Sequence, residues 1–126
     1  MLAVVTALEN TASDTYVALG TAGPAIILPF AGDYDIEIGA VAGNGTAGNG
    51  AFMSYDIGGT GAVDGDRIVG PTASAGGFNL PSVARLARKT GLTAVTLTAK
   101  YRRSNSGGTA FFELRYMAVT PVRVSG

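Results

Sequence analysis

Hydrophobic and polar residues alternate one by one from Asp33 to Ala42. One side of this stretch carries Tyr34, Ile36, Ile38, Ala40 and Ala42. The other side carries Asp33, Asp35, Glu37 and Gly39. Because successive side chains of a β-strand point to opposite faces of a sheet, this pattern predicts a strand with one face in a core and the other facing solvent.

The same alternation recurs twice further along the chain, from Ala51 to Ile57 and from Val95 to Arg102. A Gly- and Asn-rich stretch, Gly43 to Gly50, precedes the first of these and predicts a loop. Ser104 to Gly108 carries turn residues and leads into strand-like sequence from Ala110 to Val119. We therefore expect the last two strands to form a hairpin.

Shorter strand patterns complete the chain. They span Leu2 to Glu9, Tyr16 to Leu19, Ala25 to Leu28, Arg67 to Val69 and Ser82 to Lys89. The last of them also fits a helical turn, and its brevity leaves both readings open. No long helix is required, so about eight short strands at this spacing predict an all-β protein, a two-sheet antiparallel jelly-roll sandwich.

The length of 126 residues suits one domain with a single core. We expect an N-terminal strand or docking arm over residues 1–10 and a jelly-roll domain over residues 11–126. No apolar run reaches the roughly 20 residues of a membrane span. The apolar start also lacks the basic residues of an export signal. We therefore expect neither a membrane partner nor export.

Acidic and basic residues occupy different halves of the chain. No Lys or Arg precedes Arg67, and eight of the nine Asp and Glu residues lie at or before Asp66. The formal net charge is zero, which argues against nucleic acid as a partner of the whole domain. This separation suits a compact chain in which strands of one half lie between strands of the other.

In a jelly roll, the strongly alternating acidic strand lies between two strands of the basic half. The residues expected to pair across that sheet are the acidic Asp35 and Glu37 and the basic Arg115 and Arg85. Cross-strand pairs of opposite charge contribute only about 0.2–1 kcal/mol each, so they favour a register more than they add stability. If the pairs form between subunits instead, the same charges help to select the partner.

Two short motifs resemble nucleotide-binding signatures. Gly43, Gly45 and Gly48 spell G-x-G-x-x-G, which cradles a pyrophosphate only where a helix follows. The run from Asp56 to Thr60 looks like the phosphate-binding signature of the sugar kinases related to hexokinase and actin, whose folds need a far longer α/β chain. Loop glycines and a Gly-Gly turn after a strand explain both motifs better.

Candidate metal ligands and catalytic groups are few. The chain has no Cys and no His, which removes thiolate and imidazole ligands and the nucleophiles and bases built from them. Asp33 to Asp35 and Asp64 to Asp66 fall short of the run of carboxylates in a calcium loop. We therefore expect no enzymatic activity and no cofactor, while a metal ion held between loops stays an open alternative.

One basic set stands out, with Tyr101 and Tyr116 near it in the sequence. It comprises Arg85, Arg88, Lys89, Lys100, Arg102, Arg103 and Arg115. Such a set can bind phosphate or an acidic glycan, but more often it forms a solvated face or pairs with acidic strands. We expect Arg102 and Arg103 at a loop tip.

Three segments in a fixed order carry a resemblance to a known family. They run from Thr15 to Pro24, from Thr46 to Tyr55 and from Leu97 to Arg102. Over Thr11 to Val119 the chain thereby resembles the small jelly-roll modules of tailed-phage virions, which occur as head decoration proteins and as tips of fibres and minor tail proteins. Related modules resemble the trimeric domains of tumour necrosis factor and the complement C1q head, so the resemblance implies a TNF/C1q-like homotrimer.

The resemblance also implies contact residues. An aromatic row of Phe112 and Tyr116, or Phe111 on the opposite face, is the candidate trimer interface, with core packing as the alternative use. The candidates for docking on the capsid are the apolar residues Leu2, Val4 and Val5, with the loops at one end of the module as the alternative.

The resemblance implies a capsid decoration (cement) protein on the outer surface of the virion, with its own copies and the major capsid protein as partners. The alternative is a receptor- or glycan-binding tip of a tail fibre or minor tail protein. In that case the loops expected to hold a sugar are Gly43 to Gly50, Thr72 to Phe78 and Ser104 to Gly108. A cellular C1q-like or cytokine-like module is a third reading, which the missing export signal weakens.

Overall fold

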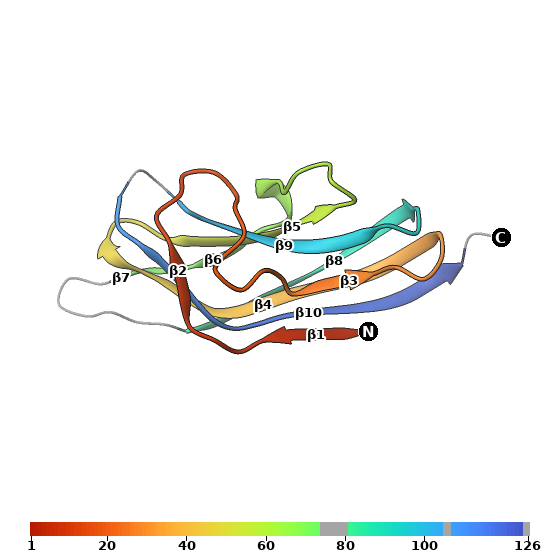
Figure 1. Cartoon of the computed structure of the whole chain (residues 1–126), viewed down its shortest axis with the longest axis horizontal. Helices are drawn as coiled ribbons and strands as arrows, with labels where there is room; N and C mark the ends of the chain where they lie inside the picture. The colour runs from red at the N-terminus through yellow and green to blue at the C-terminus, as the bar shows by residue number, and fades with distance from the viewer. Residues whose placement is uncertain (74–80, 105–106, 125–126) are drawn as a thin grey trace.

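The computed structural model describes residues 1–73, 81–104 and 107–124 and consists of two β-sheets packed face to face (Figure 1). In the first sheet, β10 (Ala110–Val124) pairs on one side with β1 (Leu2–Val5) and β2 (Glu9–Thr11). On its other side it pairs with β4 (Gly32–Ala47), whose far edge holds β8 (Ser82–Leu92) and β7 (Thr72–Ala73). The order in the second sheet is β3 (Ala25–Ile27), β9 (Thr96–Arg103), β5 (Ala51–Ile57) and β6 (Ile68–Gly70). A single 3-10 turn in the described residues, η1 (Asp64–Asp66), precedes β6.

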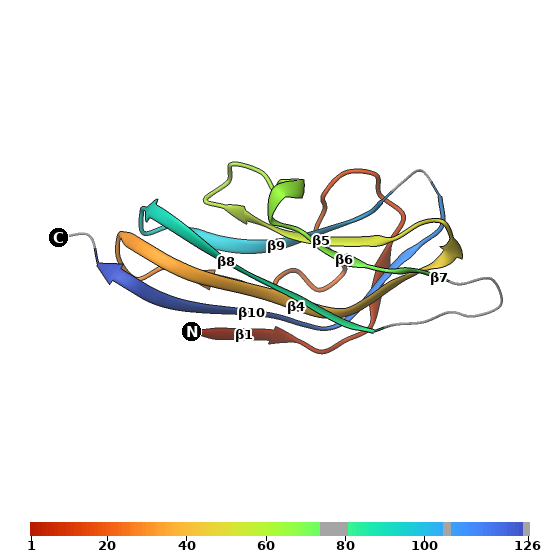
Figure 2. The same ribbon diagram turned by 180° about the vertical axis from the view of Figure 1, so that it is seen from behind.

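This strand order confirms the predicted all-β sandwich and is jelly-roll-like. Strands far apart in the chain lie side by side, and the pairing is antiparallel except between β4 and β7. As expected, β4 of the acidic half lies between β10 and β8 of the basic half, and Figure 2 shows β8 running along β4. Residues 82–92 form a strand and not a helical turn, because they pair with β4 over most of their length.

The expected hairpin of the last two strands is wrong, because β9 and β10 belong to different sheets. Both edges of β10 are occupied, by β1 and β2 on one side and by β4 on the other. The two strands meet instead across the core, where the rings of Tyr101 and Phe112 pack edge to face with centroids 4.8 Å apart.

The expected loop from Gly43 to Gly50 is also mostly strand, since β4 continues to Ala47 before the chain turns. The buried Asn44 supports this extension. Its Oδ1 accepts a hydrogen bond from the backbone N–H of Thr46 at 2.9 Å, and its Nδ2 donates to the carbonyl of Gly50 at 3.1 Å. The side chain thereby satisfies backbone groups at the point where β4 gives way to β5.

The core lies between the sheets and follows the predicted alternation. All five apolar residues of the first pattern are buried: Tyr34, Ile36, Ile38, Ala40 and Ala42. From the second sheet, Met53, Tyr55, Leu97 and Tyr101 face them. Burial of these side chains supplies the main driving force for folding, since hydrogen-bonded exposed strands alone are marginally stable.

Ion pairs connect the two halves of the chain. Every ion pair among the described residues joins an acidic residue of the first half to a basic residue of the second. The pairs are Glu9–Arg115, Asp14–Arg103, Asp35–Arg88, Asp64–Arg102 and Asp66–Lys89. The charge separation in the sequence therefore corresponds to interleaved strands in space.

The individual pairings expected for the first sheet are wrong. Asp35 lies directly opposite Arg88, whose Nε is 2.8 Å from its carboxylate, and Glu37 lies opposite Leu86. Arg85 points toward the second sheet, where its Nη1 donates to the carbonyl of Arg67 at 3.3 Å. The reason is the pleat of β8, which places even-numbered residues on the outer face of the sheet and odd-numbered residues toward the second sheet.

A close approach of the two sheets at Gly70 provides a test of the packing. The chain crosses from the second sheet to the first just after this residue, and a Cβ on Gly70 would lie 2.7 Å from the backbone carbonyl of Ala42. Gly70→Ala is therefore expected to lower the free energy of unfolding by about 1–3 kcal/mol in urea denaturation. The control Gly65→Ala, whose Cβ has nothing within 4 Å, should change it by less than about 0.5 kcal/mol. Equal effects of both changes would contradict this packing.

The exposed ion pairs lower the pKa of their carboxyl groups. An arginine hydrogen bond holds the pKa of Asp14 and of Asp35 below the ordinary value of 3.8. The pKa of Asp64 is lowered first by the hydrogen bond from Tyr16 and then by Arg102. Each of these groups therefore releases its proton more readily in the folded than in the unfolded chain.

A carboxyl with a lower pKa in the folded state adds stability above its unfolded pKa, and this stability is lost as the pH falls through the folded pKa. We expect the free energy of unfolding to be flat from neutral pH down to about pH 5 and to decrease below it. Urea denaturation at a series of pH values measures this. Arg88→Gln should make the acid-induced decrease smaller, because the pKa of Asp35 then returns toward its ordinary value. A rise in stability between about pH 4 and pH 2 would contradict the assignment.

Candidate functional site

A β-bulge in β10 decides which side chains of this strand face outward. The register with β4 shifts between Glu113 and Tyr116, and Leu114 within this interval has a positive φ of 50°. Before the bulge even-numbered residues such as Phe112 point into the core, and after it odd-numbered residues such as Met117 do so. A strict period of two would put Phe112 and Tyr116 on the same face, but the bulge separates them.

The aromatic candidates for a trimer interface are therefore divided. Phe112 is fully buried in the core of its own chain, so its assignment to a subunit interface is wrong. Phe111 and Tyr116 are partly exposed and lie on the outer side of the first sheet, because the bulge between them shifts the alternation.

The bulge also turns Arg115 inward, where its side chain is fully buried. Its Nη1 donates to the carbonyl oxygens of Thr21 and Gly23, each at 3.1 Å, and its Nη2 donates to the carboxylate of Glu9. The other carboxylate oxygen of Glu9 accepts the backbone N–H of Thr21 at 2.7 Å. Such multiple hydrogen bonds are what a buried guanidinium requires.

Tyr101 completes this buried cluster. Its hydroxyl donates to the carbonyl of Gly23 at 2.7 Å, and its ring centroid lies 5.1 Å from the guanidinium carbon of Arg115. Burial raises the pKa of Tyr101 to about 12, so the hydroxyl stays a donor at neutral pH. The segment between β2 and β3 is thereby bound to β9 and β10 at once.

The outer face of the first sheet carries exposed apolar side chains. The register aligns Val4, Tyr116, Gly39 and Ala84 in one row across four strands. The next row holds Leu2, Ala118, Glu37 and Leu86. Leu2 is 68% exposed and Leu86 is 61% exposed, at opposite sides of this face. We call the surface formed by these two rows the outer apolar face.

Tyr116 lies across the middle of the outer apolar face. Its ring covers Gly39, where any Cβ would collide with the ring, and its hydroxyl donates to the carboxylate of Glu37 at 2.5 Å. Burial, and then the neighbouring Glu37, raises the pKa of Tyr116 to about 12. Beside the ring is a hollow of about 300 Å³, lined among others by Val41, Ala84 and Leu114.

The three candidates for capsid docking lie on β1, which is hydrogen-bonded along β10. Leu2 and Val4 project from the outer apolar face, whereas Val5 is half-buried beside Arg115 in the register. Residues 2–5 are thus an edge strand of the sheet in this structure.

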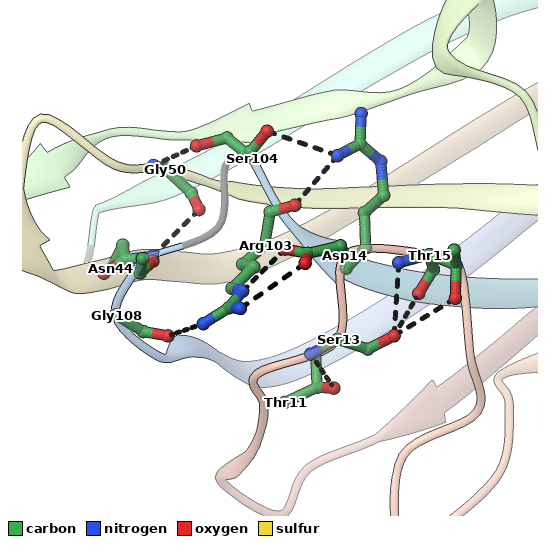
Figure 3. A network of polar contacts seen from close by, with 11 residues as sticks. Thr11, Ser13, Asp14, Thr15, Asn44, Gly50, Arg103, Ser104 and Gly108 are labelled. Atoms are coloured by element: carbon green, nitrogen blue, oxygen red, sulfur yellow. Dashed lines mark hydrogen bonds and ion pairs between the residues drawn. The ribbon is translucent and has the colours of Figure 1, made fainter.

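Arg103 links two connections at one end of the sandwich, and its neighbour Ser104 contacts a third (Figure 3). Its Nε donates to the carboxylate of Asp14 at 2.8 Å, and its Nη1 donates to the carbonyl of Gly108 at 3.0 Å. Next to it, the hydroxyl of Ser104 accepts the backbone N–H of Gly50 at 2.6 Å. Arg102 and Arg103 are therefore at the end of β9, as paired side chains and not as free cations at a loop tip.

The remaining sequence candidates take up structural roles or lie outside the described residues. The carboxylate of Asp56 accepts the N–H groups of Gly59 at 3.0 Å and Gly61 at 2.6 Å, so its motif is a turn after a strand. Within residues 1–73, 81–104 and 107–124, no three His, Cys, Asp or Glu side chains gather as metal ligands. Residues 74–78 and 105–106 of the proposed sugar-binding loops lie outside the described residues.

Neither a model of a known protein family nor a curated protein matches this sequence. The function of the chain therefore has to be argued from the surfaces of the molecule. In the part of the chain that the structure describes, no helix is long and apolar enough to cross a membrane.

The buried cluster leads to a mutational test. Arg115→Met keeps the size of the side chain but removes the cation that pairs with Glu9, the donor to the carbonyl of Thr21 and one of the two donors to the carbonyl of Gly23, so it should lower the free energy of unfolding by about 3–5 kcal/mol. Glu9→Gln alone should cost less, because the amide still accepts a hydrogen bond from Arg115.

The double variant, which combines Glu9→Gln with Arg115→Met, should be more stable than the sum of the two single effects predicts, by at least about 1 kcal/mol. Urea denaturation of the four proteins measures this coupling. Additive effects would show that the two side chains do not act together.

Proposed function

We propose that this chain is a structural protein of a tailed-phage virion, a homotrimeric decoration protein that binds the outer capsid surface and stabilises the shell. The observation that carries the proposal is the outer apolar face, with Leu2, Val4 and Leu86 projecting from it. The resemblance of the sequence to jelly-roll modules of virions supplies the biological setting.

The outer apolar face suits contact with other protein. A soluble monomer rarely exposes a contiguous apolar surface without using it, and here two aligned rows combine apolar side chains with a hollow beside Tyr116. The polar groups on and beside this face are already satisfied within the chain, since Glu37 accepts the hydroxyl of Tyr116, and Asp35 in the adjoining row pairs with Arg88. Covering them therefore leaves few unpaired groups.

The arrangement of apolar side chains fits a ring of subunits. Leu2 and Val4 lie on edge strand β1, and Leu86 lies on β8 beyond the central strands β10 and β4. In a cyclic trimer two different patches of each subunit meet, so the β1 side of one copy can pack against the β8 side of the next.

The proposed mechanism is mechanical. A rigid sandwich bound across neighbouring capsid subunits buries additional interface, and binding to the intact shell stabilises that shell over its opened form. No catalytic group takes part in this mechanism.

Self-association is tested by placing a charge in the outer apolar face. Leu86→Glu should convert the trimer into a monomer, measured by size-exclusion chromatography with light scattering, because a buried unpaired carboxylate is costly. The matched control is Ile27→Glu, which changes an equally apolar residue that is 73% exposed on β3 of the other sheet. It should leave the trimer intact. A monomeric native protein, or loss of the trimer in the control, would refute this interface.

The location is tested on particles of the phage that carries the gene. Cryo-electron microscopy should show trimeric density on the capsid, and empty shells without the protein should open at lower temperature. Density at the tail alone would reject the decoration role in favour of a receptor-binding tip.

A further inference from the structure

A second surface lies on the far sheet, away from the outer apolar face. The segment between β2 and β3 and the loop that carries η1 both rise on the same side, over β9 and β5 (Figures 1 and 2). The hydroxyl of Tyr16 joins them by donating to the carboxylate of Asp64 at 2.7 Å. Between them is an open cleft of about 630 Å³, whose lining includes Asp14, Tyr16, Gly61, Asp64 and Arg102.

The base of this cleft is held rigid by stacking. The guanidinium of Arg102 lies 4.5 Å from the ring centroid of Phe52 and 5.3 Å from that of Tyr16. The same group donates to both carboxylate oxygens of Asp64, at 3.1 Å and 2.9 Å. The hydroxyl of Ser54 donates to the carbonyl of Val63 at 2.7 Å and fixes the loop onto β5. A site organised before binding loses little freedom when a ligand arrives.

The two carboxylates of the cleft keep capacity for a ligand. The side chain of Asp64 is 49% exposed and that of Asp14 is 52% exposed. An ionised carboxylate has about four acceptor positions, and the arginines and Tyr16 use only part of them. Each carboxylate that lines the cleft is paired with an arginine, so none of the lining carboxylates is left unpaired to attract a cation. The neighbouring Arg67 stacks on Phe52 and donates to the carbonyl of Asp64.

We propose that this cleft binds a neutral saccharide. Adjacent hydroxyl groups of a sugar can donate to the open carboxylate oxygens of Asp64 or Asp14 and accept from Arg102, while the apolar face of a pyranose ring packs on Tyr16. A charged ligand fits less well, because it would have to compete with the ion pairs that Asp14 and Asp64 already form with Arg103 and Arg102. The inference is independent of the proposed capsid role, since it uses the opposite sheet.

The test is an NMR titration of isotope-labelled full-length protein with glucose, galactose, rhamnose and N-acetylglucosamine, and with N-acetylneuraminic acid as an acidic probe. At least one neutral sugar should produce saturable shifts of the amides of Tyr16, Gly61 and Asp64 in the millimolar range. Asp64→Asn, which removes a carboxylate oxygen, and Tyr16→Ala, which removes the ring on which the sugar packs, should each weaken that binding by about tenfold.

The matched control is Asp35→Asn, which also removes a partly exposed carboxylate paired with an arginine, but on the other sheet. It should bind the sugar like the native protein. The proposal is overturned if no neutral sugar gives saturable shifts at the cleft, if only the acidic probe does, or if the folded Tyr16→Ala variant binds unchanged. If one of these results is found while the trimer still decorates capsids, only the sugar-site proposal has failed and the capsid role stands.

Discussion

One buried cation fixes how the first connections of the chain are joined to its last strand. Arg115, near the end of the chain, reaches through the core to Glu9 and to the carbonyl groups of Thr21 and Gly23, near its beginning. A guanidinium placed in an apolar core is tolerable only with such a set of acceptors, so the cation imposes one position on the segment that provides them. That segment continues over the second sheet and forms one wall of the cleft that holds Tyr16. A buried contact thus determines the shape of an exposed surface.

The other ion pairs also join distant parts of the chain, and they do so closer to the surface. Because acidic residues come first and basic residues last, every pair in the described chain closes a long loop, from the Asp66–Lys89 pair to the Glu9–Arg115 pair. Each exposed pair adds little free energy, and apolar burial carries the stability. The pairs instead disfavour arrangements in which each half folds on its own, since like charges would then lie together. This makes the interleaved order the electrostatically consistent one.

The two outer surfaces of the sandwich differ in kind. The first sheet is uncovered and presents Leu2, Val4 and Leu86, which suits association with flat protein surfaces. The second is overlaid by loops whose polar side chains bind each other, as Asp64 does with Tyr16 and Arg102. Such a surface suits a small polar ligand. The two faces therefore differ in the kind of contact that they suit.

The sequence by itself determined the class of fold and most of the strands, though not the one expected over Tyr16 to Leu19, where only an isolated bridge at Val17 forms. The alternation around Ile36 and Ile38 specifies a buried face because the period of a strand is a local property of the backbone, and the division of charge indicated that distant strands are neighbours. Only the tertiary structure decided which side chains contact one another. The bulge at Leu114 reverses the alternation within β10, sending Phe112 and Arg115 inward and Tyr116 outward, and no local pattern reveals such an extra residue. The cleft likewise forms because Tyr16 and Asp64, which are 48 positions apart in the chain, contact each other. That contact depends on how the chain packs and not on the residues next to either one in the sequence.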